Sequence, residues 1–496
     1  MRRGFIVKGG VVVALVILFD YLFRDDFAGA CIGGFAAAWL AGLLIARPDV
    51  GRSRIARPAI ALAGGFALAL AYEPGPLGWA MFWCALSVAA LAPRATRFDD
   101  AWRWGARLAL HALGGIVTPV ADCRRLWLRQ RGRWRRPHAV VATLALPVIG
   151  AGVFALLFTA ANPLIEQALT SLRLPSPGRL PLWIFVALCL WPSLRPHAAV
   201  MRVARWLPDP EPRLPGTSLP SVLIALALFN ALFAVQNGLD IAFLWSGAPL
   251  PTGMTEAEYA HRGAYPLIAV ALIAGLMALA MLRPGSASEH HPWARRLVLL
   301  WVAQTLILVA SSTLRTLDYV AASMWTGWRI AALLWMALVA LGLVLIGWRI
   351  LRARSARWLI NANALAATVV LAACTVIDLG AIAAARNVRA GTPQSVDLCY
   401  LHRVGDGALG PLIALEGRPM DAATRDRVRF VRDHLLTDLA ARQSDWRRWT
   451  PRGALRLSQA RARLGPAPVR PLPVSGPAWR ECDGTIRYPA VAATQP

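Results

Sequence analysis

The sequence predicts an all-α polytopic membrane protein with about eleven transmembrane helices and a small extracytoplasmic C-terminal domain, α or α+β. Of its 496 residues, 57% are hydrophobic and only 16% are charged, whereas soluble domains carry roughly 25% charged residues. The mean hydropathy is +0.49. Apolar runs that suit a hydrocarbon core of about 30 Å recur along most of the chain.

The predicted spans are apolar runs separated by polar or Pro- and Gly-containing segments. They cover residues 11–23, 28–46, 55–72, 77–91, 139–160, 180–194, 219–245, 265–282, 297–312, 330–350 and 359–383. The first run follows Arg2, Arg3 and Lys8, as in a signal peptide. Acidic residues follow it where a small-residue cleavage site would be needed, so we interpret it as a span.

Loop charge predicts the orientation. Every second loop is rich in arginine, and such loops face the cytoplasm under the positive-inside rule. The N-terminus is then inside and the C-terminus outside, in a bacterial cytoplasmic (inner) membrane, with loop 312–328 on the outer face. This topology divides the chain into a four-helix segment, a basic amphipathic cytoplasmic segment, a membrane core of about seven helices and an extracytoplasmic domain. These parts comprise residues 1–92, 93–138, 139–385 and 386–496.

The formal net charge of +26 comes from 53 basic and 27 acidic residues. In a polytopic protein we attribute this excess to contact with anionic lipid headgroups on the cytoplasmic face, and we expect no nucleic-acid partner. Residues 99–120 and 123–136 interleave Trp and Arg with apolar residues. This pattern is typical of amphipathic helices lying on an anionic leaflet, with docking of a cytosolic partner as the alternative.

Polar residues inside spans carry the most functional information because burying them in lipid is costly. Asn230, Asn237 and Asp240 recur at offsets of seven and three, which places them on one face of a helix. Asp378 lies near the outer end of the last predicted span. These intramembrane polar residues either form hydrogen bonds between helices or line a polar cavity or ion path.

Three stretches carry a resemblance to a known family: residues 250–276, 312–345 and 387–412. They resemble the bacterial membrane family called domain of unknown function 4173, with its relative 4153. The resemblance singles out motif positions after the spans and at the start of the tail. These positions are Tyr259, Ala260, Gly263, Arg315, Tyr319, Thr326, Arg329, Asn387, Asp397, Tyr400 and Leu401. The usual Tyr-Gly-Leu-Thr before the second Arg is replaced by residues 323–326, SMWT. The family has no established activity, so the resemblance implies a topology without a reaction.

A cluster of polar residues at the outer boundary is the candidate binding site. It comprises Tyr259, Arg262, Arg315, Asp318, Tyr319 and Arg329. Arginine forks pair strongly with carboxylates, and Tyr anchors at interfaces. We therefore predict that these residues form a polar lock, meaning a set of polar contacts that joins the outer loops and holds the tail against them. The alternative is a site for a lipid headgroup or small anion, because paired arginines suit phosphate and carboxylate.

The tail resembles a small folded domain. Asp421 can cap a helix whose apolar stripe contains Val428, Val431, Leu435 and Leu439. A second helical stretch at 454–464 precedes a Pro-rich connector at 465–479. Cys399 and Cys482 are the only cysteines of this region and are available to pair outside the cytoplasm. We therefore predict a disulfide between them.

Enzyme signatures are sparse, so we expect no cofactor and no metal, and an enzyme is less favoured than a non-catalytic protein. The leading interpretation is an envelope sensor or assembly protein of unknown activity with an envelope protein partner. A transporter or channel for a small anionic or lipidic substrate is the first alternative. A membrane glycosyltransferase is the second, because the acidic loop 24–27, RDDF, resembles the first outer loop of such enzymes. The oligomeric state stays open.

Overall fold

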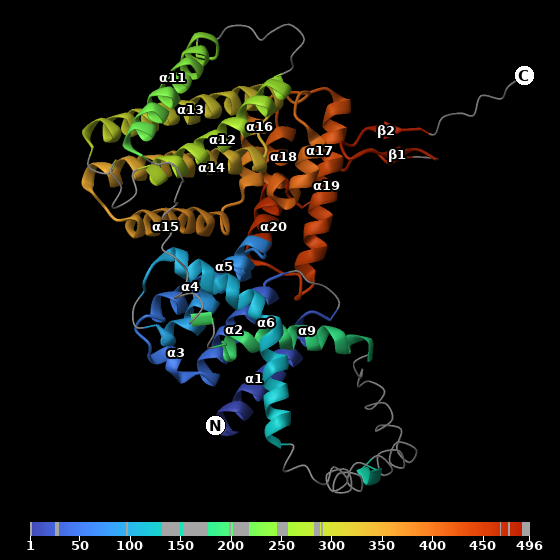
Figure 1. Cartoon of the computed structure of the whole chain (residues 1–496). Coiled ribbons are helices and arrows are strands. Elements are labelled where there is room, and N and C mark those ends of the chain that lie inside the picture. The colour runs from blue at the N-terminus through green and yellow to red at the C-terminus, as the bar shows by residue number, and fades with distance from the viewer. Residues whose placement is uncertain are drawn as a thin grey trace, which may run out of the picture.

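The protein is almost entirely helical in the computed structural model, with one short antiparallel strand pair, β1 (Trp479–Arg480) and β2 (Ile486–Arg487), near the C-terminus. The structure describes residues 2–24, 29–95, 98–130, 149–151, 177–197, 200–201, 218–245, 256–281, 288, 291–466, 468–474 and 477–488. Figure 1 shows three groups of helices that follow the chain order.

The first group packs around an aromatic core that includes Phe35, Trp39 and Phe82. Its elements are α1 (Arg2–Leu22), α2 (Cys31–Ala46), α3 (Pro48–Arg52), α4 (Arg57–Tyr72), α5 (Pro76–Leu91), η1 (Ala92–Arg94), α6 (Ala101–Gln130), η2 (Pro177–Arg179) and α9 (Leu180–Leu194). Proline occupies the first turn of α4, α5 and α9, where its missing N–H costs nothing. At Gly33 the backbone of α2 meets that of α4, since a Cβ there would lie 2.3 Å from the nitrogen of Ala71.

The second group is the central bundle. It consists of α11 (Leu219–Phe243), α12 (Glu256–Met281), α13 (Pro292–Ser323), α14 (Gly327–Arg352) and α15 (Ala356–Cys374). Its core contains Trp301, Leu226 and Leu343. The helix α13 contacts α11, α12 and α14, so it organises this group.

The third group is formed by the tail helices α16–α20. Its elements are α16 (Leu379–Ala390), α17 (Leu398–Val404), η3 (Gly405–Ala408), α18 (Leu409–Glu416), α19 (Ala422–Ser444) and α20 (Pro451–Leu464). Asp421 caps α19 by accepting from the N–H of Thr424 at 2.7 Å. The predicted stripe Val428, Val431, Leu435 and Leu439 is buried in this group's own core. Figure 1 shows the tail helices gathered at one end of the apolar helices, with α19 running across that end.

Six helices in the described part of the chain are long and apolar enough to cross a membrane. Four further apolar helices are shorter, at 10–17 residues. An all-α membrane protein is therefore supported, whereas the eleven predicted spans are not all shown. Most of the predicted span 139–160 lies outside the described residues.

Two predicted element boundaries differ from the structure. The last run, 359–383, is two helices, because α15 ends at Cys374 and α16 begins after its N-cap Asp378. The predicted outer loop 312–328 is mostly helix, since α13 continues to Ser323. The domain boundary at 385/386, which stays a prediction, lies within α16.

Within the basic segment 93–138, residues 101–130 form one long helix with Pro119 inside it, rather than two separate surface helices. This helix, α6, packs against α5, α9 and α15. Its buried face includes Arg107, which pairs with Asp99 at 2.6 Å. The helix is thus partly built into the protein, while the exposed Leu113 and Trp102 remain on its other side.

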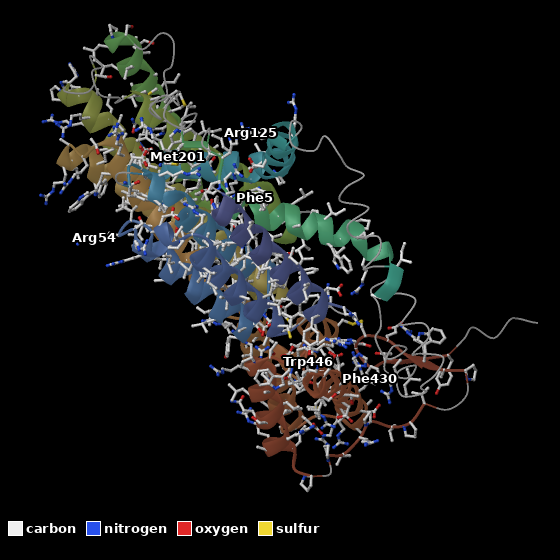
Figure 2. The ribbon with its side chains drawn as sticks, turned by 90° about the horizontal axis from the view of Figure 1, so that it is seen from below. Phe5, Arg54, Arg125, Met201, Phe430 and Trp446 are labelled. Carbon is white, nitrogen blue, oxygen red and sulfur yellow. A yellow bond between two sulfur atoms is a disulfide. The ribbon has the colours of Figure 1, made fainter. Side chains whose placement is uncertain are left out.

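The tail helices contact the ends of several apolar helices on one side. Figure 2 shows Trp446 and Phe430 at that end and Phe5, Arg54 and Arg125 away from it. In the turn between α1 and α2, the N–H of Ala30 donates to the C=O of Trp449 at 2.8 Å.

Candidate functional site

The turn between α13 and α14 is the centre of the candidate site. Met324 has a φ of 69° and a ψ of 167°, a region that residues other than Gly adopt only when surrounding contacts hold them there. Thr326 caps α14 by accepting from the N–H of Arg329 at 3.3 Å. The turn therefore requires external support, and the tail helices supply it.

Asn387, on α16, supplies the strongest contact. Its side chain accepts from the N–H of Trp325 at 2.7 Å and donates to the C=O of Trp325 at 2.8 Å. Asn387 is only 4% exposed, so both backbone groups of Trp325 find their partners away from water. The neighbouring Arg386 stacks its guanidinium over the Trp325 ring at 4.8 Å.

Tyr400, on α17, supplies the second contact. Its hydroxyl accepts from the N–H of Gly327 at 3.0 Å. Asp397 caps α17 by accepting from the N–H of Tyr400 at 2.9 Å, and the fully buried Leu401 anchors the same helix. Burial raises the pKa of the Tyr400 phenol despite the opposing bond from Gly327. The phenol therefore stays neutral at physiological pH.

Arg329 closes the turn from the other side. Its Nη1 donates to the C=O of Ser323 at 2.6 Å and also to that of Met324. Its guanidinium lies 4.1 Å from the centre of the Tyr319 ring. Five motif residues thus surround one turn: Tyr319, Thr326, Arg329, Asn387 and Tyr400. We call the contact of Trp325 and Gly327 with Asn387 and Tyr400 the junction.

The predicted outer cluster is only partly assembled. Arg315 turns towards α11, where it pairs with Asp240, and it does not join Arg329. Asp318 is exposed on α13. Tyr259 and Arg262 lie on α12, but their side chains fall outside the described residues. Of the described members, Tyr319 and Arg329 lie together while Arg315 pairs elsewhere, and the grouping of all six stays a prediction.

The polar stripe of α11 packs against α13. Asn230 donates to the C=O of Leu297 at 3.0 Å and accepts from Gln304 at 2.7 Å. Asn237 donates to the C=O of Gln304 at 3.0 Å. Asn230, Asn237 and Asp240 are each less than a tenth exposed. This arrangement matches hydrogen bonding between helices.

Asp378 is predicted to lie near the outer end of the apolar run 359–383. It lies in the break between α15 and α16, where it caps α16 and pairs with Arg456 of α20 at 2.6 Å. Arg456 also pairs with Asp406 at 3.0 Å, and Arg442 of α19 reaches the same carboxylate at 3.2 Å. These alternating charges join α16, η3, α19 and α20.

This network predicts an acid limit to the stability of the tail. Burial raises the pKa of Asp406, but its bond and charge contact with Arg456, followed by Arg442, outweigh burial and hold that pKa below 3.8. A carboxylate whose pKa is lower in the folded than in the unfolded protein stabilises the fold at pH values above its unfolded-state pKa. This stabilisation is lost as the pH falls through the folded-state pKa. We expect the stability difference between wild type and Asp406→Asn to shrink below pH 3.8. Thermal unfolding at pH 3 and pH 6 tests this, and an equal difference at both would contradict it.

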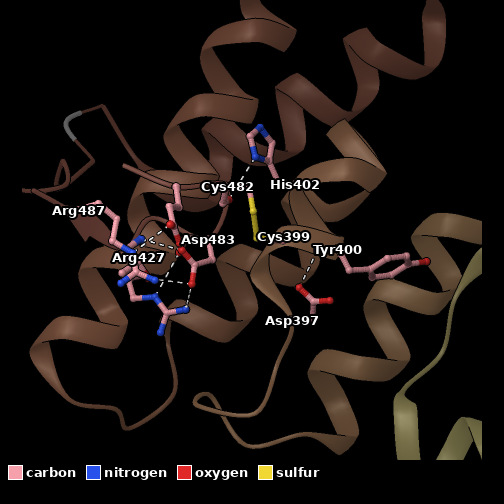
Figure 3. The surroundings of a disulfide bond; sticks show 10 residues. Asp397, Cys399, Tyr400, His402, Arg427, Cys482, Asp483 and Arg487 are labelled. Carbon is pink, nitrogen blue, oxygen red and sulfur yellow. Dashed lines mark hydrogen bonds and ion pairs between the residues drawn. A yellow bond between two sulfur atoms is a disulfide. The ribbon is translucent and has the colours of Figure 1, made fainter. Parts of the chain in front are cut away.

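A disulfide joins Cys399 of α17 to Cys482, between the two short strands, as Figure 3 shows. The Cα atoms lie 5.0 Å apart, within the usual range. Beside it, Arg427 of α19 pairs with Asp483, and His402 approaches the C=O of Cys482 at 3.2 Å. The strand pair is therefore tied to the helices that carry the junction.

Removing this disulfide should loosen the tail. It joins residues with a sequence separation of 83. A disulfide typically adds about 2–4 kcal/mol to the free energy of unfolding, mainly by restricting the unfolded chain. We expect Cys399→Ser and Cys482→Ser to lower the unfolding free energy of the tail equally, with no further loss in the double variant. A mass-spectrometric finding of both as free thiols, in protein purified without reductant, would contradict the pairing.

The described residues offer no group of three His, Cys, Asp or Glu side chains that could hold a metal ion. Together, the fold and the junction define a polytopic all-α membrane protein whose C-terminal helices are fixed to the ends of its apolar helices. A family model, domain of unknown function 4153, matches residues 56–415, and the chain belongs to that family. The match runs from α4 into α18 and includes every residue of the junction. Neither the curated proteins nor the solved structures contain a match.

Proposed function

We propose that this protein is a non-catalytic component of the bacterial envelope, whose C-terminal helices form an outer domain that senses or assembles with another envelope protein. The observation that carries the proposal is the junction. The motif residues around it hold a backbone turn, so their hydrogen-bonding groups serve to position the tail. Such a rigid mount suits a domain that presents a surface to a partner.

The proposal includes about eleven spans, an N-terminus inside and a C-terminus outside the cytoplasmic membrane, and a relation to domain of unknown function 4173. The six long apolar helices and the four shorter ones each correspond to a predicted run, with the run at 139–160 as the eleventh. The alternation of arginine-rich loops supports the orientation. The turn between α13 and α14, which lies in the predicted outer loop 312–328, contacts Asn387 and Tyr400 of the tail.

Labelling with a membrane-impermeant thiol reagent in intact cells tests the orientation. The free cysteines are replaced, the disulfide is kept, and single cysteines are introduced at Ser53, Ser323 and Ser444. We expect labelling at Ser323 and Ser444 and none at Ser53. Labelling at Ser53 alone would invert the topology and place the tail in the cytoplasm.

Photocrosslinking in cells tests the function. A photoreactive residue replaces Trp479, which is 51% exposed on the tail, and the matched control replaces Trp348, 46% exposed on α14. We expect a discrete protein adduct from position 479 that weakens in Asn387→Ala. An absence of protein adducts at 479, together with substrate flux in proteoliposomes, would favour the transporter instead. The acidic pair Asp25 and Asp26, on which the glycosyltransferase alternative rests, lies outside the described residues.

A further inference from the structure

A small basic cavity lies at the end of the first helix group that is away from the tail. It measures about 230 Å³ and lies where η1, α6 and the end of α9 meet. Four of its lining residues carry basic side chains or imidazole: Arg94, Arg125, Arg195 and His197. The buried residues Thr118 and Asp122 of α6 also line the cavity.

The cavity has an excess of positive charge. Asp122, the one carboxylate among the described lining residues, accepts from Arg195 at 3.2 Å and from the indole of Trp191 at 3.2 Å. Arg125 approaches the other oxygen of Asp122 at only 4.0 Å. One carboxylate therefore faces three guanidinium groups, which leaves two positive charges without a partner of opposite sign in the lining.

Arg94 contributes one of these two positive charges. Its Nη1 donates to the C=O of Pro196, a neutral acceptor that fixes the side chain but leaves its charge uncompensated. Arg47 and Arg195 lie close enough to repel it, and Asp49 offsets part of that repulsion. Arg47 itself already has a carboxylate partner, Asp49, at 2.6 Å. Arginines held this close without matching carboxylates are a common arrangement where an anion binds.

The position of the cavity indicates the kind of anion. It lies just beyond the ends of the apolar helices α5 and α9. In the orientation proposed above, these ends are on the arginine-rich side, where the phosphate groups of the bilayer would lie. Basic pockets between helices on the arginine-rich side of a membrane protein suit anionic lipid headgroups. Guanidinium forks bind phosphate oxygens through paired, charge-assisted hydrogen bonds.

We propose that this cavity is a binding site for a phosphate group, held by Arg94 and Arg125 and supplied by the headgroup of an anionic phospholipid. Free inorganic phosphate offers the same chemistry from a different source. The site is separate from the junction, so it stands or falls independently of the proposed role of the tail.

Native mass spectrometry of the full chain tests the site, in micelles that contain equal amounts of phosphatidylglycerol and phosphatidylcholine. The test variant is Arg94→Gln/Arg125→Gln, which keeps the Asp122–Arg195 pair. The matched control is Arg52→Gln/Arg54→Gln, which removes the same charge from exposed positions on the same side. We expect wild type and control to retain phosphatidylglycerol. The affinity of the test variant for this lipid should fall by about tenfold or more.

Calorimetry with inorganic phosphate, on protein in phosphatidylcholine nanodiscs, distinguishes the two sources. Phosphate binding that depends on Arg94 and Arg125, without selective lipid retention, would keep the anion site but overturn the lipid headgroup as its source. Equal loss of lipid in the test and control variants would show a diffuse charge effect and overturn the site. The melting temperature of each variant is measured in parallel. Lipid binding is compared between variants that melt as the wild type does, so that a loss of binding does not reflect unfolding.

Discussion

Arg315→Met should destabilise the central bundle by about 3–5 kcal/mol, because it leaves a buried carboxylate without its cationic partner. Asp240 is 3% exposed and Arg315 has a side chain that is 10% exposed. Asp240 keeps a bond from Gln236 at 3.0 Å, but an amide does not compensate its charge. Methionine has a similar length to the arginine stem, so packing changes little. Denaturant titration in mixed micelles measures the loss.

The double variant separates charge from packing. Arg315→Met/Asp240→Asn removes both charges, and we expect it to recover most of the stability lost in Arg315→Met, because replacing both partners avoids the unpaired ion. Asp318→Asn is the matched control, since that carboxylate is exposed on the same helix. It should change stability by less than about 0.5 kcal/mol. A double variant as unstable as Arg315→Met would show that the ion pair is not the cause.

Asn387→Ala should release the tail from the membrane helices. The substitution leaves both the N–H and the C=O of Trp325 without the partners they have in the wild type. A buried polar group that loses its partner costs about 1–3 kcal/mol, so the pair corresponds to about 2–6 kcal/mol. The strained Met324 should then relax in part, since two of the bonds that hold its turn are lost while those of Arg329 and Tyr400 remain. Limited proteolysis of the tail measures the release.

Asn363→Ala is the control for that substitution. Its side chain donates to the C=O of Leu359 at 2.9 Å within the same helix, so its loss removes no contact between the tail and the bundle. We expect this variant to resist proteolysis as the wild type does. Equal cleavage in the two variants would mean that loss of an Asn, rather than loss of the junction, loosens the tail.

The sequence predicted the class of fold and most helices because apolar runs report directly on burial in lipid. The prediction of helix ends failed where a helix continues through polar residues. Arg315 and Asp318 look like loop residues, yet α13 includes them because Arg315 has a partner on α11, 75 residues away. It failed again at the end of α15, where the apolar residues Val376 and Ile377 hide a break. Asp378, directly before α16, was the signal of a helix cap that could have revealed it.

The family resemblance named Asn387 and Tyr400, the tail side of the junction, but it named neither Trp325 nor Gly327 and gave no contacts. Asn387 lies 62 residues from Trp325 in the sequence, and no local pattern links an amide to a distant backbone turn. The SMWT variation at 323–326 is compatible with the junction because Asn387 bonds only backbone atoms there. Capping by Asp397 and Asp421, in contrast, depends on neighbours three residues away, and this kind of contact can be predicted from sequence.

The central claim is that Asn387 and Tyr400 hold the turn between α13 and α14. Hydrogen–deuterium exchange of the amides of Trp325 and Gly327 tests it most directly, because these N–H groups donate to the two side chains. We expect both amides to be protected in the wild type, with Trp325 exposed to exchange in Asn387→Ala and Gly327 in Tyr400→Phe. Rapid exchange of both amides in the wild type, at the same rate as in the variants, would contradict the claim.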